Sequence, residues 1–407
     1  MTTTTRTFLV REEEEGTRAP PASAPQGRAR TLGGARAPPL VRSHGGRRTR
    51  APGEVKHPMN VTELPTPGYE RVVRAEDPAS GLKAIIAVHS TRLGPALGGC
   101  RMWPYRGWDD ATFDVLRLSR GMTYKSAVAD TGLGGGKAVI LGNPKTDKSE
   151  TLFRAMGRFV ETLGGAYVTA EDVGTTVDDM VAMRKETRWV TGLPRSTGSS
   201  GDPSPWTALG CFVGIRACLE EAFGTSDLTD RTVALQGLGH VAMPLAELLR
   251  RARARLVVTD IAPERVREAV TRFQATAVHP DAIYDVPCDV FSPCALGAVV
   301  NDGTLPRLRT KIVAGAANNQ LLREEHGDRL REMGVLYAPD YVINAGGIIN
   351  VSIELEAGGY DEERSRKKVE NIHAALKAVF HLARERGIST GRAANLLAEE
   401  RLARGRA

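Results

Sequence analysis

The chain has 407 residues, of which 41% are hydrophobic and 25% are charged. This apolar share is too high for a disordered protein, and the length exceeds what one core normally organises, so we expect at least two domains. No run of 18 apolar residues occurs, and the first residues lack the apolar stretch of a secretory signal. We therefore expect a soluble, cytoplasmic protein with no membrane partner.

The net charge of +7 is concentrated at the start of the chain, because residues 1–58 alone carry +6. This segment mixes Arg, Pro, Gly and Ala without a helical or strand period, which predicts a disordered tail. Its only aromatic residue is Phe8, whereas nucleic-acid binding favours basic clusters with aromatics between them. We predict no nucleic-acid partner; Met59 is an alternative natural start.

Cysteine and histidine usage points to neither a disulfide framework nor a metal centre. The five cysteines form no CxxC pair, and the eight histidines lie far apart in the sequence. A metal-dependent oxidoreductase of the malic-enzyme type would need clustered carboxylates, and Glu171-Asp172 lacks a third ligand at a suitable spacing. We therefore predict no metal.

Strands and helices alternate after the tail. Expected strands are 81–89, 138–141 and 166–170, and expected helices are 109–121 and 149–163. This order predicts an α/β domain over residues 59–198, to which the family resemblance described below assigns a substrate-binding, catalytic and oligomerisation role. A segment rich in Gly, Ser and Pro, 192–205, then marks a domain boundary, with Ser204 as N-cap and Pro205 in the first turn of a helix that runs on over 207–223.

A compact nucleotide-binding pattern follows the boundary. It consists of a strand 232–236, a loop 237–242, a helix to about residue 253, and a strand 255–259 that ends in Asp260. Further short apolar runs at 289–292 and 311–315 extend the pattern to a doubly wound sheet over residues 199–345. An amphipathic stretch, 361–386, and a last helix, 391–403, belong to a third segment, 346–407, whose helices are expected to pack back between the domains.

The loop 237–242 has the chemistry of a dinucleotide site. Gly237 permits the turn, Gly239 lets the backbone approach a pyrophosphate at the helix N-terminus, and Ala242 keeps the helix close to the strand. Asp260 follows Gly239 by 21 residues, close to the spacing of a carboxylate that binds ribose hydroxyls and repels a 2′-phosphate. The pattern favours NAD over NADP.

Two lysines, Lys125 and Lys137, lie twelve residues apart in Gly-rich, apolar surroundings. A partly buried ammonium beside another cation has a lowered pKa, which suits a general base. Asp172, at the end of the strand 166–170, is a third candidate catalytic residue. By spacing alone, two lysines at helix ends without a catalytic role remain the alternative.

Several separated motifs together resemble the leucine, phenylalanine and valine dehydrogenase branch of the amino-acid dehydrogenases. They occur in one order from about Val72 to the C-terminal helices: GPALGGCRMW (94–103), GMTYK (121–125), GGGK (134–137), TAEDVGTT (169–176), SSGDPSP (199–205), AANNQ (316–320) and YVINAGGIINV (341–351).

The resemblance implies NAD-dependent, reversible oxidative deamination of an L-amino acid by a homo-oligomer. Lys125 would bind the substrate carboxylate with the backbone of Gly98 and Gly99, Lys137 would act as general base, and Asp172 would exchange protons with the substrate nitrogen. The remaining predicted substrate-binding residues are Leu97, Met122, Ala170, Ile348 and Val351. The predicted cofactor-binding residues are Gly237, Leu238, Gly239, His240, Val241, Asp260, Ala295, Leu296, Asn318 and Asn344.

Some positions depart from the family pattern. They are Cys100 for Thr, His240 for Asn, Asp202 for Asn, and Ser352-Ile353-Glu354 for Ala-Asp-Glu. In glutamate-using relatives, a lysine and a hydroxyl residue stand where this chain has Leu97 and Val351. An apolar pocket predicts a branched-chain substrate (leucine, valine or isoleucine), with phenylalanine or tryptophan as the alternative. A catalytically inactive NAD-binding regulatory protein is the hypothesis from another class.

Overall fold

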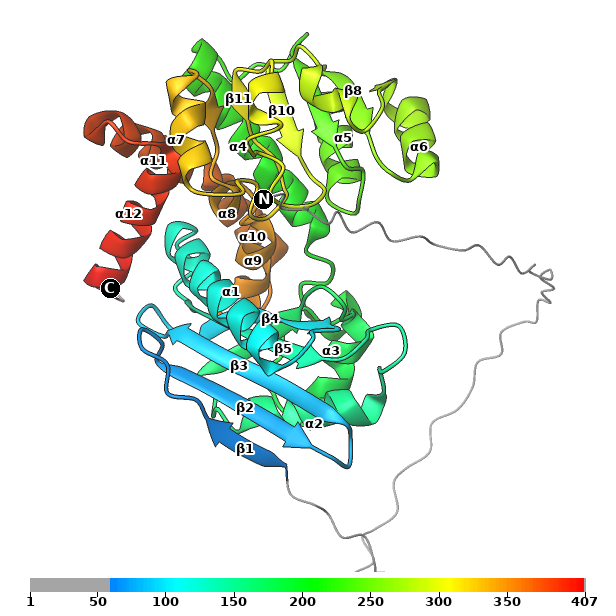
Figure 1. The fold of residues 1–407 in the computed structure, drawn as a ribbon, viewed down its shortest axis with the longest axis vertical. Helices are drawn as coiled ribbons and strands as arrows, with labels where there is room; N and C mark the ends of the chain where they lie inside the picture. The colour runs from blue at the N-terminus through cyan, green and yellow to red at the C-terminus, as the bar shows by residue number, and fades with distance from the viewer. Residues whose placement is uncertain (1–58, 406–407) are drawn as a thin grey trace, which may run out of the picture. The chain divides into compact units, whose positions relative to one another are not determined.

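The structure is a computed structural model that describes residues 59–405. The predicted tail, 1–58, lies outside the described residues. Two six-stranded sheets form the framework, each in its own half of the described chain (Figure 1). Between residues 59 and 405, no helix is long and apolar enough to cross a membrane.

The first sheet is mixed, in the order β1-β2-β3-β5-β4-β6. Strands β1, β2, β3 and β5 pair antiparallel, whereas β4 runs parallel to both β5 and β6. The carboxyl ends of β4, β5 and β6 therefore share one edge of the sheet. The strand bounds are β1 Asn60–Glu63, β2 Arg71–Asp77, β3 Leu82–Ser90, β4 Ala96–Trp103, β5 Gly134–Leu141 and β6 Tyr167–Glu171.

Side-chain alternation along β3 explains why helices cover both faces of this sheet. Ile85 and Ala87 pack under helix α1 (Trp108–Val128), with Ala111 and Val115 of that helix. Ile86 and its even-numbered neighbours pack instead with α2 (Glu150–Glu161) and α3 (Val177–Arg184). Both faces are buried, so the strand reads as one apolar run rather than as an alternating pattern.

Two expected elements of this half have different bounds in the structure. The helix expected over 109–121 continues to Val128, which places Lys125 in its last turn. The strand expected from 138 begins at Gly134, so the glycines before Lys137 are strand residues rather than a loop. Glycine has a low strand propensity, and these glycines are kept in the strand by close packing against neighbouring backbone.

The second sheet is entirely parallel, in the order β12-β11-β10-β7-β8-β9. This is the order of a doubly wound dinucleotide-binding sheet, and the predicted fold class is confirmed. The strands are β7 Thr232–Gln236, β8 Arg255–Thr259, β9 Thr276–Ala277, β10 Val290–Pro293, β11 Ile312–Val313 and β12 Leu336–Tyr337. The associated helices are α4 Ser204–Phe223, α5 Ala242–Arg251, α6 Pro263–Phe273 and α7 Glu325–Glu332.

The predicted N-cap at Ser204 is wrong. Helix α4 begins at Ser204 itself, and the preceding residue, Pro203, occupies the cap position without a side-chain hydrogen bond. The carboxylate of Asp202 accepts a hydrogen bond from the Ser204 backbone N–H at 2.8 Å instead. An Asp two residues upstream therefore satisfies this helix end, and Pro205 lies in the first turn as expected.

The C-terminal helices return to the first half of the chain. They are α8 Asp340–Ile343, α9 Gly346–Ser352, α10 Glu362–Glu370, α11 Ile372–Arg386 and α12 Thr390–Arg404. Arg401 of α12 donates to the carbonyl oxygens of Ala127 and Val128 at 2.9 and 2.8 Å, which satisfies the end of α1. The stretch expected as one amphipathic segment over 361–386 is two helices that meet at Asn371.

Candidate active site

One cavity of about 570 Å³ brings the three predicted catalytic residues together, although they are far apart in sequence. It lies at the carboxyl ends of the parallel strands of the first sheet and faces the glycine loop of the second. Every predicted substrate-binding residue lines it: Leu97, Gly98, Gly99, Met122, Lys125, Ala170, Ile348 and Val351. The predicted cofactor-binding residues His240, Val241, Asn318 and Asn344 line it as well.

Lys137 and Asp172 form a buried ion pair in this cavity. Nζ of Lys137 lies 3.0 Å from Oδ2 of Asp172, and the lysine is only 4% exposed. Burial alone would raise the pKa of Asp172, but the nearby cations Lys137 and Arg101 outweigh this effect and lower it. Asp172 is therefore a carboxylate at neutral pH.

Lys125 is linked to the nucleotide-binding half by a hydrogen-bond chain. Its ammonium donates to Oδ1 of Asn344 at 2.7 Å, and Nδ2 of Asn344 donates to Oδ1 of Asn318 at 2.8 Å. Burial, opposed by Asp340 and assisted by the charge of Lys137, lowers the pKa of Lys125 to about 8. Most Lys125 side chains remain charged at pH 7 and can bind an anion.

This lowered pKa predicts a pH dependence of 2-oxo acid binding. Above pH 8, Lys125 loses its proton in the free enzyme, so affinity for a 2-oxo acid should fall about tenfold per pH unit as the charged fraction falls. The measurement is the dissociation constant of 4-methyl-2-oxopentanoate between pH 6.5 and 9.5. Lys125→Arg keeps its charge and should flatten the profile, whereas an unchanged slope in this variant would assign the titration to another group.

The glycines around the predicted catalytic residues are required by close backbone approach. A Cβ at Gly98 would lie 1.8 Å from the carbonyl oxygen of Gly136, and one at Gly99 would lie 2.6 Å from the Cβ of Asp172. A Cβ at Gly135 would lie 2.0 Å from the backbone N of Thr123. These contacts draw β4, β5 and α1 together, which places Lys125, Lys137 and Asp172 around one cavity.

The sequence analysis missed charged residues behind Asp172. Arg101 of β4 contacts Asp172 through Nε and Asp114 of α1 through Nη1, at 3.0 and 2.9 Å. Tyr105 donates its hydroxyl to the same Asp114 oxygen at 2.7 Å. The available signal was an arginine between Cys100 and Met102 in an otherwise apolar strand, because such a charge needs a partner when buried.

The glycine loop has the local geometry that a dinucleotide needs. Gly237 has φ +92°, and a Cβ there would lie 2.7 Å from the Cβ of Ala295, so the turn is restricted to glycine. A Cβ at Gly239 would meet open space, and helix α5 begins after Val241 without a side-chain cap. Backbone N–H groups at this helix end are free to receive a pyrophosphate, so the residues present fit the cofactor.

Other predicted cofactor residues lie outside the lining of the cavity. They are Gly237, Leu238, Gly239, Asp260, Ala295 and Leu296. Asp260 accepts hydrogen bonds from the N–H groups of Leu238 and Ala262 at 2.6 and 2.8 Å, which fixes its carboxylate beside the loop. Leu296 is 82% exposed, in the loop after β10.

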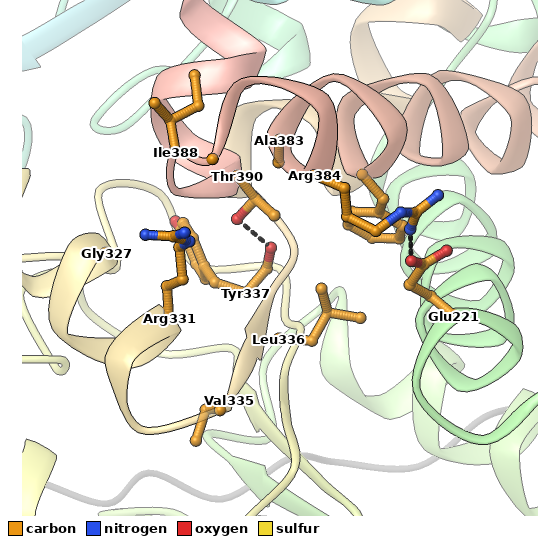
Figure 2. Close-up of a pocket in the computed structure, with 13 residues that line it drawn as sticks. Glu221, Gly327, Arg331, Val335, Leu336, Tyr337, Ala383, Arg384, Ile388 and Thr390 are labelled. Atoms are coloured by element: carbon orange, nitrogen blue, oxygen red, sulfur yellow. Dashed lines mark hydrogen bonds and ion pairs between the residues drawn. The ribbon is translucent and has the colours of Figure 1, made fainter.

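A second cavity, of about 610 Å³, lies between β12, α7, α11 and α4 (Figure 2). Its charged residues are Arg331, Arg384 and Glu221, and the last two form an ion pair. The hydroxyl of Thr390 donates to the carbonyl oxygen of Tyr337 at 2.6 Å across it. None of the predicted catalytic residues lines this second cavity. Although the two cavities are similar in size, the candidate site is therefore the cavity that contains Lys125, Lys137 and Asp172.

The altered segment 352–354 does not form the wall of the candidate site. The Ser352 hydroxyl donates to the carbonyl oxygen of Ile349 at 2.7 Å, and Ile353 is fully buried. Glu354 accepts from the backbone N–H groups of Gly192 and Ser200 at 3.1 and 3.0 Å. Only Val351, just before this segment, lines the cavity, so neither of the two residues that depart from the family pattern, Ser352 and Ile353, forms part of the pocket lining.

Comparison with known proteins identifies the family. Residues 69–189 match the Glu/Leu/Phe/Val dehydrogenase dimerisation domain, and residues 258–406 match the Glutamate/Leucine/Phenylalanine/Valine dehydrogenase model. The leucine dehydrogenase of Thermoactinomyces intermedius is 56% identical over 334 residues, 82% of this chain and 91% of that protein. The chain belongs to the Glu/Leu/Phe/Val dehydrogenase family. It is an amino-acid dehydrogenase, as the sequence motifs predict.

Relatives with other substrates are also similar. The phenylalanine dehydrogenase of Bacillus thermotolerans is 48% identical, over 83% of this chain and 90% of that protein. The crystal structure of L-tryptophan dehydrogenase from Nostoc punctiforme is 45% identical with a TM-score of 0.74, covering 83% of this chain and 96% of that one. The fold is therefore shared by relatives that differ in the size of the amino acid they are named for.

Proposed function

We propose that the enzyme catalyses the reversible NAD-dependent oxidative deamination of a branched-chain L-amino acid, with leucine preferred. The substrate, NAD⁺ and water give the 2-oxo acid, ammonium, NADH and a proton. The observation that carries this proposal is the cavity in which Lys125, Lys137 and Asp172 lie beside an apolar set. Leucine dehydrogenases at 53–56% identity support the choice of leucine within the branched-chain group.

Substrate binding is assigned to Lys125 and the glycines of β4. The Lys125 ammonium pairs with the substrate carboxylate, and the backbone of Gly98 and Gly99 supplies further contacts beside it. The side chain of the substrate points into the apolar pocket of Leu97, Met122, Ala170, Ile348 and Val351. This arrangement fixes the α-carbon between the lysines and the nucleotide-binding half.

Lys137 is assigned as the general base and Asp172 as the proton-exchanging carboxylate. Neutral Lys137 removes a proton from the water that attacks the imino carbon. Asp172 exchanges a proton with the amino or imino nitrogen bonded to the same carbon. Because Nζ of Lys137 lies 3.0 Å from Oδ2 of Asp172, both side chains can act on the same carbon–nitrogen bond of the substrate.

NAD, when bound, supplies the acceptor for the α-hydrogen, which leaves as hydride. The loop 237–241 would hold the pyrophosphate and Asp260 the ribose hydroxyls. Ala295 and Leu296 would contact the dinucleotide beside the loop, and Asn318 and Asn344 would orient the nicotinamide. These residues would bring the bound dinucleotide to the substrate held by the other half.

The direct test is NADH absorbance at 340 nm after L-leucine, L-valine, L-isoleucine, L-phenylalanine, L-tryptophan or L-glutamate is added with NAD. Leucine or another branched-chain residue should give the highest kcat/KM. A higher kcat/KM for phenylalanine or tryptophan would support the second candidate function, that of an aromatic amino-acid dehydrogenase, which the phenylalanine and tryptophan dehydrogenase relatives favour. Dinucleotide binding without turnover of any amino acid would support the regulatory alternative.

Cofactor choice gives a second expected result. NAD should exceed NADP by at least about tenfold in kcat/KM, since a repulsion of about 1.4 kcal/mol between Asp260 and a 2′-phosphate corresponds to that factor. Asp260→Asn keeps an acceptor for the Leu238 N–H and should bring the ratio closer to one. Equal use of both cofactors by the unaltered enzyme would contradict the role of Asp260.

The assembly is proposed to be a homo-oligomer, supported by the match of residues 69–189 to a dimerisation domain. The domain boundaries at 198 and 345, and the cytoplasmic location, stay predictions from sequence.

A further inference from the structure

We infer that Arg101 is a positioning residue for the deamination, because it shares one oxygen of Asp172 with Lys137 and anchors that oxygen to helix α1. The inference rests on the proposed function and adds a residue to which the sequence motifs gave no role. It is carried by the contacts that join Lys137, Asp172, Arg101 and Asp114 in a continuous charged chain behind the candidate active site.

The register of the first sheet places these groups on one face. Arg101 of β4 is paired with Val139 of β5, and Lys137 lies two residues before Val139, opposite Ala87 of β3. Val139 and Ala87 both pack under α1. Arg101 and Lys137 therefore point to the α1 side of the sheet, where side chains two residues apart share a face.

Both cations contact the same oxygen of Asp172. Nε of Arg101 and Nζ of Lys137 each lie 3.0 Å from Oδ2. Within residues 59–405, no hydrogen bond to Oδ1 is formed. Oδ2 is therefore occupied by two cations, which leaves Oδ1 as the oxygen that exchanges a proton with the substrate nitrogen.

Arg101 is itself held in place by α1. Its Nη1 lies 2.9 Å from Oδ2 of Asp114, to which Tyr105 also donates at 2.7 Å. Arg117 contacts the other Asp114 oxygen, Oδ1, at 3.0 Å. A guanidinium can bridge two carboxylates with fixed geometry, whereas a lysine offers a single point charge.

The bridge also affects the charge balance around Asp172. Burial raises the pKa of this carboxyl, and the two cations Lys137 and Arg101 outweigh burial and lower it. Without Arg101, one of these two cations is lost, so the pKa of Asp172 rises. Arg101 thus helps to keep Asp172 in the carboxylate form at neutral pH.

The test compares Arg101→Met with Arg117→Met, a matched control that contacts Asp114 but not Asp172. Arg101→Met should lower kcat/KM for L-leucine by about 10- to 100-fold, the range for loss of a hydrogen bond to a charged group. The ascending limb of its pH profile should move to higher pH, with KM for NAD within about twofold of the unaltered enzyme. Arg117→Met should keep both kcat/KM for L-leucine and KM for NAD within about threefold of the unaltered enzyme, and it should leave the ascending limb of the pH profile in place.

Two further measurements separate positioning from a merely structural role. Millimolar guanidinium ion should restore part of the activity of Arg101→Met, and Arg101→Lys should recover part of it through the single bond to Asp172. If Arg101→Met does not fold, Asp114→Asn, which keeps Arg101 but weakens its anchor, should lower kcat/KM about three- to tenfold with the same shift of the limb.

The inference would be overturned if a folded Arg101→Met kept kcat/KM within threefold of the unaltered enzyme or showed an unmoved ascending limb of the pH profile. An equal loss of kcat/KM in Arg117→Met would also overturn it. These outcomes are ratios to the unaltered enzyme. Failure of the unaltered enzyme to turn over any amino acid would instead refute the proposed function, so the two failures are distinguishable.

Discussion

Replacing Lys137 with alanine is expected to lower kcat for L-leucine at least 100-fold while NADH binding stays within about twofold. The ammonium of Lys137 is buried against Asp172, and no other lysine reaches that carboxylate at such a distance among residues 59–405. Removal of the proposed base should therefore leave the attacking water without a proton acceptor. The measurements are steady-state kcat and the fluorescence titration of NADH.

A second variant guards against a trivial loss of folding. Lys137→Met fills most of the space of the lysine stem and should show the same loss of kcat with a thermal midpoint close to that of the unaltered enzyme. Lys185→Ala, which removes an exposed lysine paired with Glu150, should leave kcat unchanged. Turnover above a hundredth of the unaltered value in both Lys137 variants would assign the base to another residue.

The nucleotide-binding half was largely predictable because its local signals agree with its fold. The strands Thr232–Gln236 and Arg255–Thr259 have the predicted bounds, since short β-branched and aliphatic runs stand directly between a turn and a glycine loop. The first sheet was less predictable. Strand β4 carries Gly98 and Gly99, whose low strand propensity hides a strand that is stabilised by neighbouring backbone.

The candidate site was likewise predictable from the sequence only in part. Lys125, Lys137 and Asp172 were identified from motifs, and the fold brings them to one cavity. The contact of Lys125 with Asn344 and that of Arg101 with Asp114 join residues 219 and 13 positions apart, and neither partner is marked by local spacing. Such pairs depend on how sheets and helices pack, which single-sequence patterns do not encode.

Discrimination against acidic substrates is the second large effect that we expect. Glutamate should be used about 1,000-fold less efficiently than leucine in kcat/KM, which corresponds to roughly 4 kcal/mol. The proposed side-chain pocket consists of Leu97, Met122, Ala170, Ile348 and Val351, which line the cavity and offer no cation for a second carboxylate. Burial of an unpaired carboxylate costs several kcal/mol, which the remaining contacts do not offset.

L-Methionine is the matched control for this prediction, because its side chain is unbranched, similar in length to that of glutamate, and uncharged. It should be used within about 30-fold of leucine, so that charge rather than length accounts for the rejection of glutamate. Val351→Ala should raise the kcat/KM of phenylalanine relative to leucine by widening the pocket beside Ile348, without rescuing glutamate. If glutamate were the best substrate, the assignment of the apolar pocket would be wrong. A preference for phenylalanine in the unaltered enzyme would overturn only the argument from pocket size, because it would show that the space beside Ala170 and Val351 accommodates an aromatic ring.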